Sequence, residues 1–139
     1  MVNAPIVNKL YCPFRRKYVA ALPEEQVRQA FLRGLTEKLS YPKSLIGVEV
    51  PIQVGAGIEK RCDAVVYSPK LQPLMLLEFK APNVPLTQTV LDQAAIYNTT
   101  LHAAYIVLAN DVQTVVAHIT PDNQIEFLNN IPAWSQLLP

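Results

Sequence analysis

The sequence predicts a mixed α/β domain in which helices cover a central mixed β-sheet, and three observations favour this fold class. Short apolar runs bounded by Pro, Gly and Asn are typical of buried strands. Two longer segments repeat apolar residues at helical spacing, one before and one after the most apolar run. The elements follow the order helix, strand hairpin, helix, strand, as expected when a crossover helix packs back onto a sheet.

The bulk composition is that of one globular domain. Of the 139 residues, 50% are hydrophobic and 17% are charged, which argues against a disordered chain. No apolar run approaches the roughly 20 residues of a membrane-spanning helix. The chain is therefore expected to form one domain, divided into an N-terminal arm, a core and a C-terminal tail over residues 1–20, 21–128 and 129–139 of the full range 1–139.

The expected cellular compartment of the protein is inferred from its N-terminal sequence and its cysteines. The N-terminus lacks the basic-then-apolar order of a signal peptide. The two cysteines, Cys12 and Cys62, have no metal-binding spacing, and nothing in the sequence argues for a disulfide. We expect a cytoplasmic protein with reduced thiols and no membrane contact.

Charge is unevenly distributed along the chain. All 12 Lys and Arg residues and seven of the 11 acidic residues lie within positions 1–80. Positions 81–139 contain the other four acidic residues and no base. This asymmetry indicates either one face suited to phosphates or a chance cluster on a solvated surface.

The first 20 residues show no clean period and contain a short basic and aromatic cluster, Tyr11–Tyr18. We expect an arm or an edge strand. Basic residues interleaved with aromatic rings can grip a nucleic-acid backbone. The alternative is that the rings pack on the protein while the charges are solvated.

The first helix is expected to begin at Pro23 and end near Leu39. Proline suits the first helical turn, and the two acids that follow it favour the positive end of the helix dipole. The spacing to the apolar positions further along predicts that Glu24 lies on the buried face and that Glu25 points to solvent.

Three strands should follow, over residues 47–54, 61–67 and roughly 74–80. Pro51 in the first indicates an edge or a bulge. The second and third should pair as a hairpin. In that arrangement Asp63 and Glu78 come to lie at the same end of neighbouring strands and face one cleft.

A second helix is expected over residues 86–100, with Thr87 or Thr89 as its cap. Gln93 and Tyr97 lie one turn apart on one side of this helix. The residues expected to face the sheet are Val90, Ala94, Ile96 and Tyr97. Apolar strands should follow over 104–109, 112–119 and 124–128, and Trp134 should dock the tail.

The most apolar run, residues 74–80, ends in two charges. Alternation along a strand puts Glu78 and Lys80 on one face, and charges at the end of a buried strand need partners. Together with Asp63, the two carboxylates could hold Mg²⁺, with the backbone carbonyl of Phe79 as a further hard ligand. Lys80 could orient an attacking water or stabilise transition-state charge. The alternative is a partly buried Glu78–Lys80 ion pair that ties down the strand end.

Asp63, Glu78-Phe79-Lys80, Glu24 on the preceding helix and Gln93-Ala94-Ala95-Ile96-Tyr97 together resemble the PD-(D/E)XK nuclease superfamily, in the branch with an additional Gln-x-x-x-Tyr motif. Four longer segments contain or adjoin these residues: Pro23-Glu24-Glu25-Gln26-Val27-Arg28-Gln29, Tyr41-Pro42-Lys43-Ser44-Leu45, Arg61-Cys62-Asp63-Ala64-Val65-Val66-Tyr67 and Leu77-Glu78-Phe79-Lys80-Ala81-Pro82. In these segments the chain is more closely similar to the N-terminal nuclease domain of type I restriction enzyme R (motor) subunits, and the resemblance runs from about Leu22 to Asn110.

The resemblance implies a restriction-endonuclease-like fold and Mg²⁺-dependent endonucleolytic cleavage of DNA phosphodiesters, with Mn²⁺ able to replace Mg²⁺. It implies that Asp63 and Glu78 are metal ligands and that Lys80 positions water as base or electrophile. It further implies a helix carboxylate that contacts a water on the metal, and residues that position the DNA or the active site. The resemblance assigns the role of helix carboxylate to Glu24, with Glu25 as the less favoured candidate. It assigns the positioning role to Gln93 and Tyr97.

The sequence departs from this family in two ways. It contains no Gly-x-x-x-x-Gly-Lys phosphate loop, so we expect no ATPase motor in this polypeptide. Asp63 is preceded by Cys62 and not by the Pro of the superfamily pattern. Expected partners are DNA, restriction-modification subunits and a second copy of the chain. The alternative function is a catalytically silent module of the same fold that binds nucleic acid or a protein.

Overall fold

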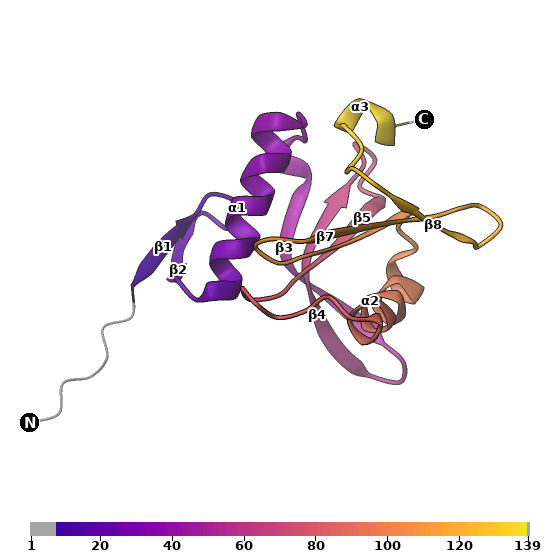
Figure 1. Cartoon of the computed structure of the whole chain (residues 1–139), viewed down its shortest axis with the longest axis horizontal. Coiled ribbons are helices and arrows are strands. Elements are labelled where there is room, and N and C mark those ends of the chain that lie inside the picture. The colour runs from indigo at the N-terminus through magenta and orange to yellow at the C-terminus, as the bar shows by residue number, and fades with distance from the viewer. Residues whose placement is uncertain (1–7, 139) are drawn as a thin grey trace, which may run out of the picture.

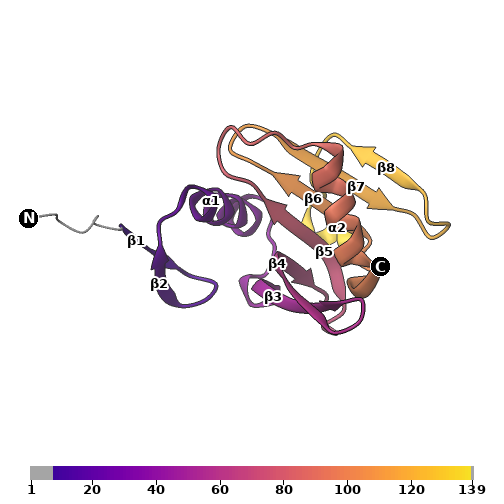
Figure 2. The ribbon, with the colours of Figure 1, turned by 90° about the horizontal axis from the view of Figure 1, so that it is seen from below.

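A six-stranded sheet with one long helix on each face forms the body of the molecule (Figures 1 and 2). The computed structural model describes residues 8–138. Residues 1–7 of the expected arm lie outside this range. The strands run in the order β3 (Ile46–Val54), β4 (Ile58–Tyr67), β5 (Pro73–Phe79), β6 (Tyr105–Ala109), β7 (Thr114–Ile119) and β8 (Ile125–Leu128).

The sheet is mixed. β5 and β6 are parallel and joined by the crossover helix α2 (Gln88–Leu101), whereas every other neighbouring pair is antiparallel. The predicted hairpin of β4 and β5 and the predicted order of elements are therefore confirmed. β3 is an edge strand, which accommodates Pro51 because proline has no N–H to donate to a neighbour.

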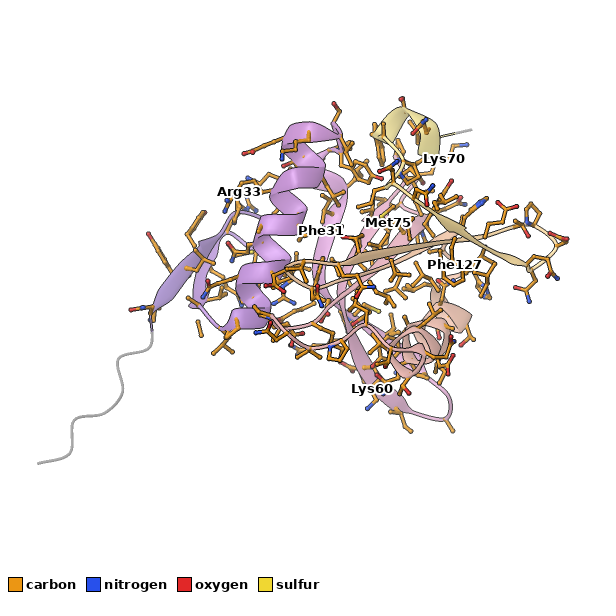
Figure 3. All side chains as sticks on the ribbon, in the orientation of Figure 1. Phe31, Arg33, Lys60, Lys70, Met75 and Phe127 are labelled. Carbon is orange, nitrogen blue, oxygen red and sulfur yellow. The ribbon has the colours of Figure 1, made fainter. Side chains whose placement is uncertain are left out.

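Helix α1 (Pro23–Lys38) covers one face of the sheet. Leu32 and Leu35 are fully buried against residues from the central strands, including Leu77. Phe31 packs on the same cluster, and its ring centroid lies 5.4 Å from that of Phe79. Phe31 on α1 and Met75 in the sheet, both labelled in Figure 3, contribute to this cluster. The first helix, expected from Pro23 to near Leu39, is therefore confirmed.

Helix α2 covers the opposite face with Leu91 and Ala94, but Ile96 does not face the sheet as predicted. Ile96 is 51% exposed because it lies on the far side of the helix from Leu91 and Ala94. Asn98 is buried instead. Its side chain closes the turn after the helix by donating to the carbonyl of Ala103 and accepting from the N–H of Ala103.

The N-terminal arm forms a small separate hairpin of β1 (Lys9–Cys12) and β2 (Lys17–Ala20). This hairpin lies beside α1 in both ribbon views (Figures 1 and 2). Its turn places Arg16 at a positive φ of 52° and directs the side chain of Arg15 toward the body of the molecule. Tyr18 in this hairpin remains 69% exposed.

The C-terminal tail packs against the end of α1 through α3 (Trp134–Leu137). The ring centroid of Trp134 lies 5.6 Å from that of Tyr41. The Tyr41 hydroxyl donates to the carbonyl of Pro132 at 2.7 Å, and the backbone N–H of Trp134 donates to Leu39. Trp134 therefore docks the tail as predicted.

Two smaller expectations concern membranes and thiols. Across residues 8–138, no helix has the length and apolar character needed to cross a membrane. Cys12 and Cys62 are both free and both buried. Cys62 lies in the cluster on the α2 side, as expected for a small core residue.

Candidate functional site

Strands β4 and β5 stop pairing at Asp63 and diverge there. We call this point the fork of β4 and β5, and the side chain of Asp63 lies in it. The pairing of β4 with β5 ends at Ala64 and Leu77, whereas β4 continues to pair with β3. The backbone N–H of Phe79, just beyond that point, donates to Asp63 Oδ2 at 2.7 Å. The N–H of Asp63 points in turn to Glu78 Oε1 at 3.4 Å. The structure thus brings Asp63 and Glu78 together at one end of neighbouring strands.

The carboxyl groups of Asp63 and Glu78 interact strongly. Burial, then the negative charge of Asp63 and a hydrogen bond with it, raise the pKa of Glu78 to about 9. Two adjacent carboxylates cannot both be ionised without a compensating cation. Near neutral pH, Glu78 is therefore protonated in the protein alone and would give this proton up if a cation bound.

Lys80 supplies a positive charge beside this pair. It follows β5, is half-buried, and is fixed by its backbone N–H, which donates to the carbonyl of Ala109 at 2.9 Å. Its ammonium partly offsets the burial and the Asp63 charge that raise the pKa values of Glu24 and Glu78, so it lies within electrostatic range of both, although no Lys80 salt bridge is seen among residues 8–138. The structure therefore groups Lys80 with the acidic pair.

Glu24 reaches the same region from helix α1. Burial is the largest influence on its pKa, the charge of Asp63 is the next, and the net effect is to raise the pKa above its ordinary value. Glu24 is nevertheless an exposed residue. The prediction that it lies on the buried face of the helix is wrong, but its exposed carboxylate still faces the site.

The buried acid of the first helical turn is Glu25, which was predicted to point to solvent. Glu25 is only 5% exposed and binds the side chains of Arg15, Arg28 and Gln29. Burial alone would raise its pKa, but the hydrogen bonds from Arg28, Arg15 and Gln29 lower it overall. With its oxygens committed to these donors, Glu25 is a structural carboxylate, and Glu24 is the better candidate for contact with a ligand.

Arginine residues adjoining the acidic pair were not predicted from the sequence. Arg28 lies with its Nη1 atom 3.8 Å from Asp63 Oδ1. Glu25, Arg28 and Gln29 occupy positions i, i+3 and i+4 of one helix, a spacing that could have indicated a buried polar cluster. The approach of Arg15 from the hairpin and of Glu49 from β3 had no such local signal.

The two residues of the predicted Gln-x-x-x-Tyr motif differ in their burial. Tyr97 is half-buried, and its pKa is raised first by burial and then by the nearby charges of Glu78, Cys62 and Asp63. Its phenol is therefore within electrostatic range of the acidic pair. Gln93 is exposed on α2, one turn earlier, and no hydrogen bond from it is seen within the described residues.

A groove of about 620 Å³ runs between Asp63 and the β1–β2 hairpin. Glu24, Arg28 and Asp63 line it on the side of the acidic pair, and Lys17 and Tyr18 line it on the side of the hairpin. The candidate site is therefore open to a long ligand that extends along the hairpin.

The donor set fits a hard divalent cation. Asp63 and Glu78 provide carboxylate oxygens, and burial together with repulsion between the two groups raises the pKa of Glu78, so a bound dication would relieve this repulsion. Between residues 8 and 138, no group of three or more His, Cys, Asp or Glu side chains is arranged to hold a metal ion. Mg²⁺ suits such a set because it is commonly held by one or two carboxylates and keeps several waters.

Comparisons with known proteins agree with this fold. A sequence model of the family described as "Type I restriction enzyme R protein N terminus" matches residues 23–132. The cryo-electron-microscopy structure of a DrdV–DNA complex is similar, with a TM-score of 0.51 and 19% identity, over 82% of this chain and 11% of that chain. No curated protein matches the sequence.

A second structure is similar over nearly its whole length. It is the crystal structure of a candidate nuclease belonging to DUF820 from Anabaena variabilis, with a TM-score of 0.53 and 11% identity. The similarity covers 94% of this chain and 84% of that chain. At these identities the two structures show the fold alone. That fold is the restriction-endonuclease-like arrangement expected from the sequence.

Proposed function

Because the chain belongs to the family of type I restriction enzyme R protein N-terminal domains, we propose that it hydrolyses DNA phosphodiester bonds in a metal-dependent reaction. The observation that carries this proposal is the pairing of Asp63 with Glu78 beside Lys80 at the fork of β4 and β5. DNA as the substrate is supported by the family and by the similar fold in the DrdV–DNA complex.

We propose Mg²⁺ as the cofactor, with Mn²⁺ able to replace it. Asp63 and Glu78 would hold the ion, and the backbone carbonyl of Phe79 would be a further ligand. When bound, such an ion lowers the pKa of water and neutralises charge that develops on a phosphate.

The remaining roles fall to side chains of this chain. Lys80 would orient the attacking water or stabilise negative charge on the phosphate oxygens. Glu24, which is exposed at the mouth of the site, would accept a hydrogen bond from water. Arg28 would hold the Asp63 carboxylate in place, while Gln93 and Tyr97 would position the DNA or the active site.

A plasmid-nicking assay tests the proposal. The wild-type protein should convert supercoiled plasmid to nicked circles with Mg²⁺ or Mn²⁺ and not with EDTA. Lys80→Ala should lower the rate by about a hundredfold, because one preorganised positive charge at the reaction centre is lost. Lys70→Ala is the matched control. Lys70, labelled in Figure 3, lies in the turn before β5, whereas Glu78 lies near the other end of that strand.

Two outcomes would contradict the proposal. Nicking that persists in EDTA would exclude a metal-dependent reaction, and equal rates for Lys80→Ala and the wild type would remove Lys80 from the reaction. DNA binding without any nicking would support the alternative of a silent binding module. Linear product that forms without prior accumulation of nicked circles requires two active sites acting together. It would support the proposed homodimer, which we expect to work with restriction-modification subunits.

Metal affinity should depend on pH. The pKa of Glu78 is raised to about 9 in the metal-free protein, so the carboxyl group is protonated below that pH. A metal ion must displace this proton to bind. Affinity for Mn²⁺ should therefore rise by up to about tenfold per pH unit toward neutral and alkaline pH and level off above about pH 9. Isothermal titration calorimetry in buffers of different ionisation enthalpy would measure both the affinity and the released proton.

Glu78→Gln is the control for this pH dependence, since an amide has no proton to release in this range. It should bind Mn²⁺ weakly and with little dependence on pH. A wild-type affinity that stays constant across the same range would show that Glu78 does not give up a proton to the metal.

A further inference from the structure

Three arginine side chains converge on the carboxylate of Glu49, next to the acidic pair. Arg15 Nη1 lies 3.0 Å from Glu49 Oε1, Arg28 Nη2 lies 3.4 Å from the same oxygen, and Arg61 Nη1 lies 3.6 Å from Oε2. The arginines come from the hairpin turn, helix α1 and strand β4. Guanidinium groups repel one another, so an arrangement of this kind needs an anion at its centre.

The anion now at the centre is held in an unusual conformation. Glu49 has a positive φ of 54° in the middle of β3, although it is not glycine. Its neighbours Val48 and Val50 pair with Ala64 and Cys62, so Glu49 lies across from Asp63. Strained backbone of this kind persists only where surrounding contacts enforce it and is common at ligand sites.

Glu49 can leave this position more easily than the other acid of the cluster. The side chain of Glu49 is 38% exposed. The side chain of Glu25 is 6% exposed and forms salt bridges with Arg15 and Arg28. Rotation of Glu49 into solvent would leave three guanidinium groups facing the groove. Guanidinium groups bind phosphate with the same paired N–H geometry that they use for carboxylates.

The cluster also lies where a bound DNA strand would pass. Arg15, Arg28, Glu49, Arg61 and Asp63 all line the groove that runs between Asp63 and the hairpin. Arg28 joins the two sites, because its Nη1 atom is 3.8 Å from Asp63 Oδ1. A phosphate cleaved at Asp63 would therefore have its neighbour along the strand close to the arginines.

We propose that Arg15, Arg28 and Arg61 bind a DNA phosphate adjacent to the one that is cleaved, and that Glu49 occupies this site in the free protein as a substitute for that phosphate. This inference deepens the proposed nuclease function and rests on it for the identity of the ligand. DNA binding then requires Glu49 to be displaced, so the intact carboxylate weakens the affinity that the arginines would otherwise give.

Binding of a fluorescently labelled DNA duplex, measured by anisotropy in EDTA, tests the proposal without any cleavage. Glu49→Gln should bind about fivefold to tenfold more tightly than the wild type, because a competing anion is removed. Arg61→Ala should weaken binding about fivefold or more and lower the slope of log K against log salt by about one. Arg61 is suitable because it is exposed, whereas Arg15 and Arg28 are buried and support the fold.

Matched controls separate this effect from a general change in charge. Glu37→Gln removes an exposed carboxylate near the far end of α1, and Lys70→Ala removes an exposed cation distant from the groove. Both should bind DNA within about twofold of the wild type. Glu49→Gly, which accepts a positive φ without strain, should reproduce the tightening seen with Glu49→Gln.

Wild-type affinity in both Glu49 variants, or a gain no larger than that of Glu37→Gln, would overturn the proposal. An unchanged affinity of Arg61→Ala would also overturn it. Since the assay contains no metal, a failure of the nicking experiment leaves these results valid. The two proposals can therefore fail separately.

Discussion

Replacement of Asp63 by Asn is expected to reduce the rate of plasmid nicking at least about a thousandfold in Mg²⁺. The substitution removes one of the two carboxylates proposed to hold the metal, and with it the charge that makes the pair attractive to a dication. The rate would be measured under single-turnover conditions, with enzyme in excess over supercoiled plasmid. Asp92→Asn, an exposed carboxylate on α2, is the matched control and should nick at the wild-type rate.

The same variant should keep its fold, which makes the result interpretable. The side-chain oxygen of Asn can still accept the hydrogen bond from the backbone N–H of Phe79 at the fork of β4 and β5. Loss of the Asp63 charge also removes one cause of the raised pKa of Glu78. The melting temperature should therefore equal or exceed that of the wild type. Nicking at the wild-type rate would show that Asp63 is not a metal ligand.

Replacement of Glu25 by Ala is expected to lower the free energy of unfolding by about 3–5 kcal/mol. Glu25 is the shared acceptor for Arg15 and Arg28, whose side chains are 13% and 9% exposed. Without it, two largely buried guanidinium groups lose their main partner, and the hairpin loses its ion pair with α1. Urea denaturation followed by circular dichroism would measure the change.

Glu24→Ala is the matched control, one residue earlier on the same helix. Glu24 is exposed and no salt bridge is seen for it within the described residues, so its loss should change stability by less than about 0.5 kcal/mol. Its loss should instead slow nicking. Equal stability of the two variants would show that the ion pairs of Glu25 do not hold the hairpin to the body of the protein.

The sheet and the acidic pair were predictable because they depend on simple periodicity. Alternation along two apolar strands, joined by a Pro-containing turn, was enough to expect β4 and β5 to pair with Asp63 next to Glu78. The charged end of β5 was informative for the same reason, since Glu78 and Lys80 break an otherwise apolar strand.

The polar interior was not predictable because its partners are distant in sequence. The helical period was read from apolar residues alone, so it placed Glu24 rather than Glu25 on the buried face of α1. Glu25 is buried because Arg15 reaches it from the hairpin. The side chain of Glu49 likewise contacts arginines from three different elements, which no local pattern could indicate. Ile96 was misplaced for a related reason, as the polar Asn98 takes a buried position on α2.

The hydrogen bond from the Phe79 amide to Asp63 gives the site a spectroscopic reporter in the main chain. The nuclear magnetic resonance shift of one amide proton follows the charge on the oxygen that accepts it. A single backbone resonance would therefore register protonation of the pair, arrival of an ion and loss of the carboxylate, with every side chain left native. Chemistry at the junction of two strands can in this way be followed in solution before any substrate is known.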